Sequence, residues 1–207
     1  MSAKGGKKVA ATAAGAKLAA GPLAGKTVTF GIAGGVAAYK AADAIRLFVK
    51  AGATVRTILT RNAERFVTPY LLEALTGQPC ATRLFNRIEK GGVGSYAHLD
   101  FARPLDLFVI APATANTLYK LAHGAADDLL STTALSVQCA KLICPSMNVN
   151  MWDAPPVQRN VKQLEADGWT VLGPDPGDLA CGDTGFGRLV GVDAIFARGA
   201  ELLAKRS

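Results

Sequence analysis

Two side chains in this sequence have the chemistry to move protons. Cys181 lies in LACGDTGFGRL (residues 179–189), whose closely spaced glycines favour a mobile or ligand-contacting flap over a core element. A thiol on such a flap could donate or accept a proton. His98 follows the flexible run GGVGSYA and begins a predicted helix, where it is either a surface or capping residue or a proton-transfer group.

A glycine-rich turn, GIAGGVAAYK (residues 31–40), joins a predicted strand to a predicted helix. Backbone N–H groups in such a turn can approach an anion, and the helix N-terminus favours negative charge. The turn lacks a complete GxGxxG or Walker A pattern, so it indicates neither a dinucleotide nor a nucleoside triphosphate. It is therefore either a phosphate site or a tight turn that needs glycine for packing. The later segment TRNA (residues 60–63) could complete a phosphate site or serve as a polar helix cap.

Two further turns carry polar side chains. APATANT (residues 111–117) has small residues that would let a flat ring lie against the backbone, with Asn116 and the threonines as hydrogen-bonding groups. PSMNVNMW (residues 145–152) combines amide, thioether and indole side chains. Each segment could also be a loop anchored by its proline, but two such turns in one domain favour a site.

These turns must be positioned by alternating strands and helices. Short β-branched runs alternate with helical periodicity, which predicts successive βα units around a parallel sheet. We expect one doubly wound α/β domain over residues 26–207, Rossmann-like or flavodoxin-like, with helices on both faces. Ligands in such sheets bind at the carboxyl ends of the strands. The predicted strands are Thr27–Ile32, Thr54–Thr60, Asp106–Ala111, Lys141–Pro145 and Thr170–Leu172.

The helix boundaries carry their own signals. Thr68 and Pro69 predict a helix start, and Gly77 predicts its end. His123, just before Gly124, is expected to cap the C-terminus of another helix. Two helices should each bury one apolar stripe, made of Ala41, Ala44, Ile45 and Phe48 in the first and of Val157, Val161 and Leu164 in the second.

Composition excludes several classes of protein. The formal net charge is +7 over 207 residues, but five of the 23 basic residues are lysines within residues 1–26, where no acidic residue occurs. The remainder is nearly neutral, which argues against nucleic-acid binding, and no apolar run is long enough for a membrane span. We expect residues 1–25 to form a disordered Ala/Gly/Lys tail. Four cysteines without a CxxC pair indicate a cytoplasmic protein, and two histidines argue against a metal site.

In their order and approximate spacing, these motifs resemble the homo-oligomeric flavin-containing cysteine decarboxylases over about residues 26–188. The resemblance rests on GIAGGVAAYK, His98, APATANT, GAADDLLST, PSMNVNMW and LACGDTGFGRL. It implies His98 as catalytic base and Cys181 as proton donor, with no metal. It implies bound FMN at Gly34, Gly35, Val36, Thr60, Arg61, Asn62, Thr114, Ala115, Asn116, Thr117 and Ser146, and substrate at Asn148, Met151, Leu179 and Ala180.

The chain most resembles those family members that convert 4′-phosphopantothenoylcysteine to 4′-phosphopantetheine in coenzyme A biosynthesis. In that reaction, FMN oxidises the thiol-bearing carbon to a thioaldehyde, CO₂ leaves, and the reduced flavin returns the electrons. The resemblance also implies a homo-oligomer, a trimer that can build a dodecamer, with sites between neighbouring subunits. Bacterial relatives often carry a ligase domain on the same chain, and we expect this chain to act without one.

Three other functions stay open. A peptidyl-cysteine decarboxylase would act on the C-terminal Cys of a ribosomal peptide with the same flavin site. A flavin prenyltransferase is disfavoured because it does not require PSMNVNMW or the cysteine flap. A non-catalytic regulatory flavoprotein subunit is disfavoured by the presence of His98, Asn148 and Cys181. The segment RLVGV (residues 188–192) departs from the usual family pattern after the flap, so its path and its contacts with substrate are uncertain.

Overall fold

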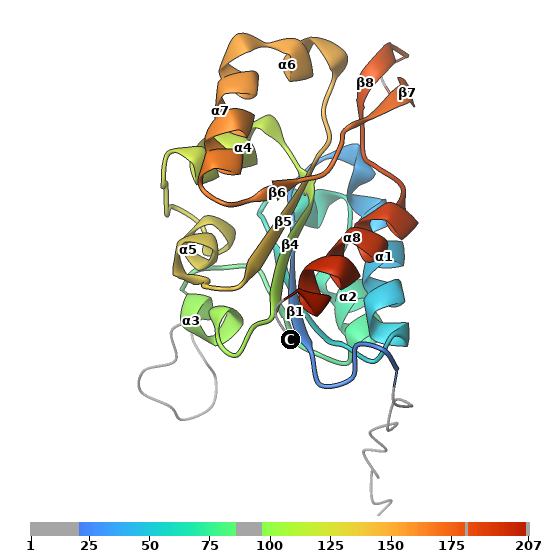
Figure 1. Ribbon diagram of the computed structural model, residues 1–207, viewed down its shortest axis with the longest axis vertical. Coiled ribbons are helices and arrows are strands. Elements are labelled where there is room, and N and C mark those ends of the chain that lie inside the picture. Colours follow the sequence, from blue (N-terminus) through green and yellow to red (C-terminus); the bar gives the residue numbers. More distant parts are fainter. Residues whose placement is uncertain (1–20, 86–96, 181, 206–207) are drawn as a thin grey trace, which may run out of the picture.

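A six-stranded parallel sheet forms the centre of the protein (Figure 1). The computed structural model describes residues 21–85, 97–180 and 182–205. The strand order is β3-β2-β1-β4-β5-β6, which is the Rossmann order, and a separate antiparallel pair is made of β7 and β8. The strands of the central sheet are β1 (Thr27–Ile32), β2 (Thr54–Leu59), β3 (Cys80–Ala81), β4 (Leu107–Ala113), β5 (Ala140–Pro145) and β6 (Thr170–Val171); the pair is β7 (Asp175–Asp178) and β8 (Thr184–Arg188).

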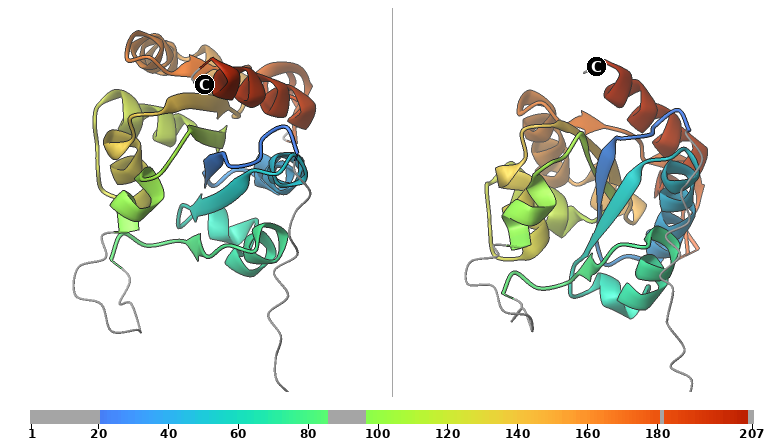
Figure 2. Two further views of the ribbon diagram at one scale, coloured as in Figure 1. Left: turned by 60° about the horizontal axis from the view of Figure 1, so that its bottom comes forward. Right: turned by 90° about the horizontal axis from the view of Figure 1, so that it is seen from below.

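Helices cover both faces of the sheet (Figures 1 and 2). One face carries α1 (Tyr39–Lys50), α2 (Pro69–Thr76) and α8 (Val192–Ala204). The other carries α3 (Ala97–Ala102), α4 (Ala115–Ala122), α5 (Leu129–Ser136) and α7 (Pro155–Ala166). The short helix α6 (Val149–Asp153) follows β5, and two 3-10 turns span Val36–Ala38 and Ala63–Arg65. Within the described ranges, no helix is both long enough and apolar enough to cross a bilayer.

The predicted local signals are confirmed in four helices. The stripe predicted for α1 is buried, and so are Val157, Val161 and Leu164 of α7. The Thr68 hydroxyl accepts a hydrogen bond from the Leu71 N–H at the start of α2, Pro69 is its first residue, and Gly77 ends it with φ +65°. His123 is the C-cap of α4, as expected.

The five predicted strands are present, with ends that differ by one or two residues. Three strands were not predicted, because none has an apolar run. Strand β3 is only two residues long, β7 reads DPGD, and β8 reads TGFGR. The segment expected as a flap is thus largely a β-hairpin outside the central sheet, which lies beside α6 (Figure 1).

The ordered domain begins earlier than expected. Residues 21–25, which we assigned to a disordered tail, form a turn in which Leu23 is buried. The Leu23 N–H donates to the Ala51 carbonyl at 2.8 Å, and Gly21 packs directly against the same carbonyl. Alanine and glycine content concealed this anchor in the sequence. The rest of the predicted tail, residues 1–20, lies outside the described residues.

Candidate functional site

Two adjoining cavities lie at the carboxyl ends of the strands. Strands β1 and β4 are neighbours, and the chain winds away from them in opposite directions, which makes their ends the topological switch point. Cavity A, of about 430 Å³, extends toward α6 and the β7–β8 hairpin. Cavity B, of about 650 Å³, extends toward the end of β2 and helix α4. Gly34 and Thr114 line both.

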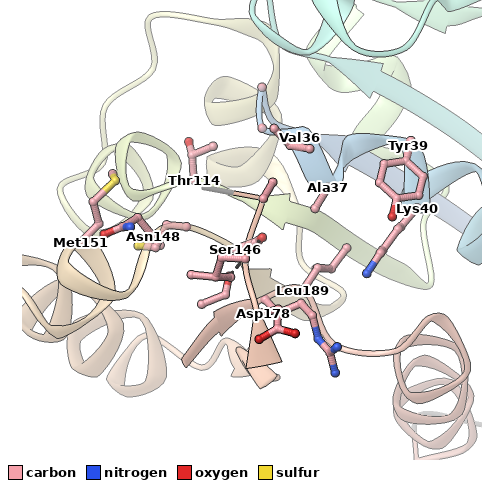
Figure 3. Close-up of a pocket in the computed structure, with 17 residues that line it drawn as sticks. Val36, Ala37, Tyr39, Lys40, Thr114, Ser146, Asn148, Met151, Asp178 and Leu189 are labelled. Atoms are coloured by element: carbon pink, nitrogen blue, oxygen red, sulfur yellow. Dashed lines mark hydrogen bonds between the residues drawn. The ribbon is translucent and has the colours of Figure 1, made fainter. Parts of the chain in front are cut away.

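Cavity A gathers residues from five separate turns (Figure 3). Asn148 and Met151 lie on one side, and Tyr39 and Lys40 lie on the other. Nine predicted site residues line it: Gly34, Gly35, Val36, Thr114, Ser146, Asn148, Met151, Leu179 and Ala180.

Cavity B is lined mainly by polar and charged side chains. It contains Arg61, Arg65 and Lys120 as cations, and Asp127 and Asp128 as anions. The predicted residues on its wall are Gly34, Thr60, Arg61, Asn62, Thr114, Asn116 and Thr117.

Gly34 brings the first two strand-end turns into direct contact. A Cβ at position 34 would lie 2.3 Å from the Asn62 Cβ and 2.6 Å from its carbonyl carbon, so no larger residue fits without a shift. At Gly35 the nearest atom would be the Thr114 Cγ2 at 3.8 Å, which is ordinary contact. Of the two interpretations of the glycine turn, tight packing therefore applies at Gly34, while Gly35 leaves open space facing cavity A.

The threonines at two strand ends bond to the turns that follow them. The Thr60 hydroxyl accepts from the Ala63 N–H at 3.3 Å, but the N-cap of the 3-10 turn Ala63–Arg65 is Asn62, which makes no side-chain cap hydrogen bond, so the cap predicted for this segment is not formed. The Thr114 hydroxyl accepts from the Thr117 N–H at 3.3 Å and is the N-cap of α4. Because Thr114 also lines cavity B, its capping role and a ligand role are compatible.

A partly exposed ion cluster lines cavity B. The Lys120 ammonium lies 2.7 Å from carboxylate oxygens of both Asp127 and Asp128. Burial opposes ionisation of Asp128, but Lys120 and hydrogen bonds from Ser131 outweigh it and hold the pKa of Asp128 below its usual value. Asp128 also forms a capping box with Ser131 at the start of α5. The cluster thus fixes α4 to the segment that precedes α5.

The segment after β5 joins cavity A to the hairpin. The Met147 N–H donates to the Gly187 carbonyl at 2.9 Å, and the Ser146 hydroxyl donates to the same oxygen at 3.3 Å. Gly187 has φ +156°, and a Cβ there would lie 2.2 Å from the Met147 carbonyl oxygen. The hairpin therefore lies against this segment by backbone contact.

Among the described residues, two predicted site residues, His98 and Ala115, line neither cavity. His98 is half-buried on α3, which packs against α5 and whose Phe101 carbonyl accepts from the Thr29 hydroxyl at 3.0 Å. Figure 1 shows α3 at the end of the molecule opposite α6 and the hairpin. Ala115 is the first residue of α4 but faces neither cavity. Cys181 lies outside the described residues.

The described thiols are poorly suited to proton transfer. Burial raises the pKa of Cys80 to about 11 and raises that of Cys144 still further. Cys139 is buried as well. Cys181 therefore stays the cysteine of interest on sequence grounds alone.

Several wall residues were not predicted. Lys40 and Tyr39 follow the glycine turn, and Asp178 and Arg188 end the two hairpin strands, all on cavity A. Lys120, Asp127 and Asp128 are the corresponding omissions at cavity B, of which the aspartates stand in the GAADDLLST motif. The sequence signal that could have identified most of these residues is their position near the end of a helix or strand.

The altered segment after the hairpin has a defined path. Leu189 and Val190 are buried, and Gly191 is the N-cap of α8. Leu189 also lines cavity A. The departure from the family pattern therefore leads directly into a helix.

A doubly wound domain with polar turns around cavities at its switch point is the architecture of a nucleotide-cofactor protein. The chain belongs to the Flavoprotein family, whose model matches residues 18–203, and its relatives include FMN-dependent cysteine decarboxylases. The coenzyme A biosynthesis bifunctional protein CoaBC of Bacillus subtilis is 42% identical over 167 residues, and that of Vibrio cholerae is 38% identical over 168 residues. Each alignment covers 81% of this chain, which spans about two fifths of the length of these curated relatives.

Solved structures show the same fold. The FMN-dependent cysteine decarboxylase SpaF superposes with a TM-score of 0.74 at 32% identity, covering 88% of this chain and 99% of SpaF. A PPC decarboxylase mutant complexed with pantothenoylaminoethenethiol superposes with a TM-score of 0.74 at 27% identity, with the same coverage.

Proposed function

We propose that this protein is an FMN-dependent decarboxylase that converts 4′-phosphopantothenoylcysteine to 4′-phosphopantetheine. The observation that carries the proposal is that cavities A and B meet at Gly34 and Thr114. One ligand can thus contact the basic, polar wall of cavity B while a second contacts Asn148 in cavity A. The similarity to CoaBC and to PPC decarboxylase supports this reaction.

The residues present fit FMN. Open space at Gly35 and the polar wall of cavity B suit a phosphate, and the small residues after β4 suit a flat ring. When bound, FMN would supply two-electron redox chemistry at the thiol-bearing carbon of the substrate. We assign the phosphate to Gly34, Gly35, Val36, Thr60, Arg61 and Asn62, and the ring to Thr114, Ala115, Asn116, Thr117 and Ser146.

Protein groups would orient the substrate and move protons. We assign to the Asn148 side-chain amide a hydrogen bond to the substrate carboxylate, and to Met151, Leu179 and Ala180 the contacts that enclose the substrate. His98 would accept a proton as the substrate is oxidised, and Cys181 would donate one as the product is completed.

The position of His98 favours a shared site. Because His98 lies away from both cavities of its own chain, we propose a homo-oligomer, a trimer that can build a dodecamer, in which it serves the cavity of a neighbouring copy. Mixing His98→Asn chains with Asn148→Ala chains should then restore part of the activity that each variant lacks. Absence of any recovery in mixed oligomers would contradict the shared site.

The direct test is turnover. Purified protein should carry FMN, and mass spectrometry should show loss of CO₂ from 4′-phosphopantothenoylcysteine. His98→Asn should abolish flavin reduction by substrate. Cys181→Ser should retain oxidation and release an ene-thiol one H₂ lighter than the normal product, whereas normal turnover would refute the role of Cys181.

A second substrate class is a peptide ending in cysteine, which is compatible with the similarity to SpaF, an FMN-dependent cysteine decarboxylase. Lys40 and Arg188 on the wall of cavity A support the phosphorylated substrate instead, since they add two cations against the one carboxylate of Asp178. A panel of both substrates decides between them. Protein that binds FMN and decarboxylates neither would support the non-catalytic alternative.

A further inference from the structure

Asn148 is held in one orientation by its own helix. Its side-chain Oδ1 accepts a hydrogen bond from the Asn150 N–H at 2.9 Å, which makes Asn148 the N-cap of α6. This contact fixes the amide, so the NH₂ end must point away from the helix. Asn148 lies on the wall of cavity A (Figure 3).

A carboxylate of the same chain already accepts from that NH₂ group. Asn148 Nδ2 donates to Asp183 Oδ2 at 2.5 Å. Asp183 lies between β7 and β8, in the tip of the hairpin, and its residue is exposed. A hydrogen bond from an amide to a carboxylate is charge-assisted. The proposed function assigns the same donor, the Asn148 amide, to the carboxylate of the substrate.

We propose that Asp183 is a specificity-determining residue that competes with the substrate carboxylate for Asn148. The inference rests on the proposed function. In the ligand-free protein the Asp183 carboxylate occupies the amide, and a ligand must bring its own carboxylate to displace it. A ligand without a carboxylate leaves the Asp183–Asn148 bond in place.

Simultaneous binding of both carboxylates is unfavourable. The two N–H groups of one amide would place two acceptors within about 5 Å of each other. Two negative charges at that separation repel. Replacement of the Asp183 carboxylate by the substrate carboxylate is therefore favoured over binding of both carboxylates to the Asn148 amide.

The hairpin tip can release Asn148 while the base stays attached. At the base, the Gly187 carbonyl accepts from the Met147 N–H and from the Ser146 hydroxyl. At the tip, the Leu179 N–H donates to the Asp183 carbonyl at 2.8 Å, which is a contact within the hairpin. None of these three bonds uses the Asp183 side chain, so rotation of that side chain leaves them in place.

The test compares two ligands that differ only by a carboxylate and that lack the oxidisable thiol. These are 4′-phosphopantothenoylserine and N-(4′-phosphopantothenoyl)ethanolamine, titrated calorimetrically into FMN-loaded protein. Asp183→Ala should bind the serine ligand roughly five- to tenfold more tightly than wild type, because the competitor is gone. Its affinity for the ethanolamine ligand should be unchanged.

Two variants serve as controls. Asp183→Asn keeps an acceptor but removes the charge, so it should show a smaller gain for the serine ligand. Asp178→Asn removes a charge from the same cavity wall without touching the Asn148 bond, and should not reproduce the gain of Asp183→Ala. Weaker binding of the serine ligand by Asp183→Ala, or an equal change for both ligands, would overturn the proposal.

A ligand-free measurement separates this inference from the proposed function. Backbone hydrogen exchange across residues 182–188 should be faster in Asp183→Ala than in wild type, and identical exchange would overturn the inference. If neither phosphopantothenoyl ligand binds wild type, the proposed substrate is wrong. The affinity comparison is then repeated with a peptide ending in serine and its counterpart ending in ethanolamine. The hydrogen-exchange result tests the Asp183–Asn148 bond independently of the substrate.

Discussion

Cavities A and B share two residues but differ in almost everything else. Cavity B is lined by three cations, two carboxylates and several hydroxyl and amide groups, and the Lys120–Asp127–Asp128 ion cluster joins two parts of its wall. Cavity A has thioether and aliphatic side chains, with its charges at the ends of elements, and one wall is a hairpin attached by backbone contacts. The difference places a charged cavity beside a less polar one whose wall includes a hairpin, both at the carboxyl ends of the same sheet.

The shared boundary should be the most sensitive position. Gly34→Ala places a Cβ within 2.6 Å of the Asn62 backbone and forces the first two turns apart, so FMN bound per chain should fall to roughly a tenth or less. Flavin absorbance of the purified protein measures this. Gly191→Ala is the control, because a Cβ there would meet no atom within 4 Å and Gly191 lines neither cavity. Equal flavin loss in both variants would mean that the contact with Asn62 is not the cause.

A single charge in cavity B should matter less, and only for the cofactor. Arg61→Ala removes one of the cations that line cavity B, and FMN affinity should fall roughly tenfold, the usual worth of a charge-assisted bond. Fluorescence titration of apoprotein with FMN measures the Kd. Arg46→Ala, an exposed residue of α1, should leave the Kd unchanged. An unchanged Kd for Arg61→Ala would contradict the assignment of the FMN phosphate to cavity B.

The ion cluster should contribute to stability rather than to ligand binding. Asp128→Ala removes a helix cap and a partner of Lys120, which should cost about 1–2 kcal/mol and lower Tm by roughly 3–6 °C. Asp127→Ala leaves the cap intact, and its side chain is 65% exposed, so its effect should be much smaller. Thermal unfolding followed by circular dichroism compares them. Equal losses of stability in the two variants would contradict the larger stabilising contribution assigned to Asp128.

The stability that Asp128 contributes should depend on pH in one direction. Its pKa is lower in the folded protein than in the unfolded chain, so the contribution is present above the unfolded value of about 4 and is lost as pH falls through the folded value. The difference in unfolding free energy between wild type and Asp128→Ala should therefore be constant near neutral pH and shrink below about pH 4. A difference that grows on acidification would show that Asp128 is not ionised in the folded state.

Local sequence signals correctly predicted the elements that are defined by residues close together in the chain. The stripe of α1, the cap of α2 and the β-branched core strands depend on residues close together in the chain, and all are present. Strands β7 and β8 could not be predicted because glycine and proline occupy four of their nine positions and neither strand has an apolar run. They are defined by pairing with each other and by the approach of Gly187 to Met147, which no periodicity reveals.

The same limit applies to the site. Residues adjacent to strand ends, such as Gly34 and Asn148, were found because the fold class says where ligands bind. Lys120 and Arg188 were missed because their place on a cavity wall depends on how a helix and a hairpin pack. His98 is the reverse case, since sequence order alone cannot say that α3 lies at the end of the molecule opposite α6.

Both edges of the central sheet are formed by strands of two residues, β3 and β6. An edge this short offers few unpaired backbone groups to a strand from another molecule, which protects against edge-to-edge aggregation. It also means that copies of this chain would not associate by extending the sheet. Within the described ranges, this leaves helices, turns, side chains and the β7–β8 hairpin as the surfaces for association, and substitutions there can tune association without disturbing the central sheet.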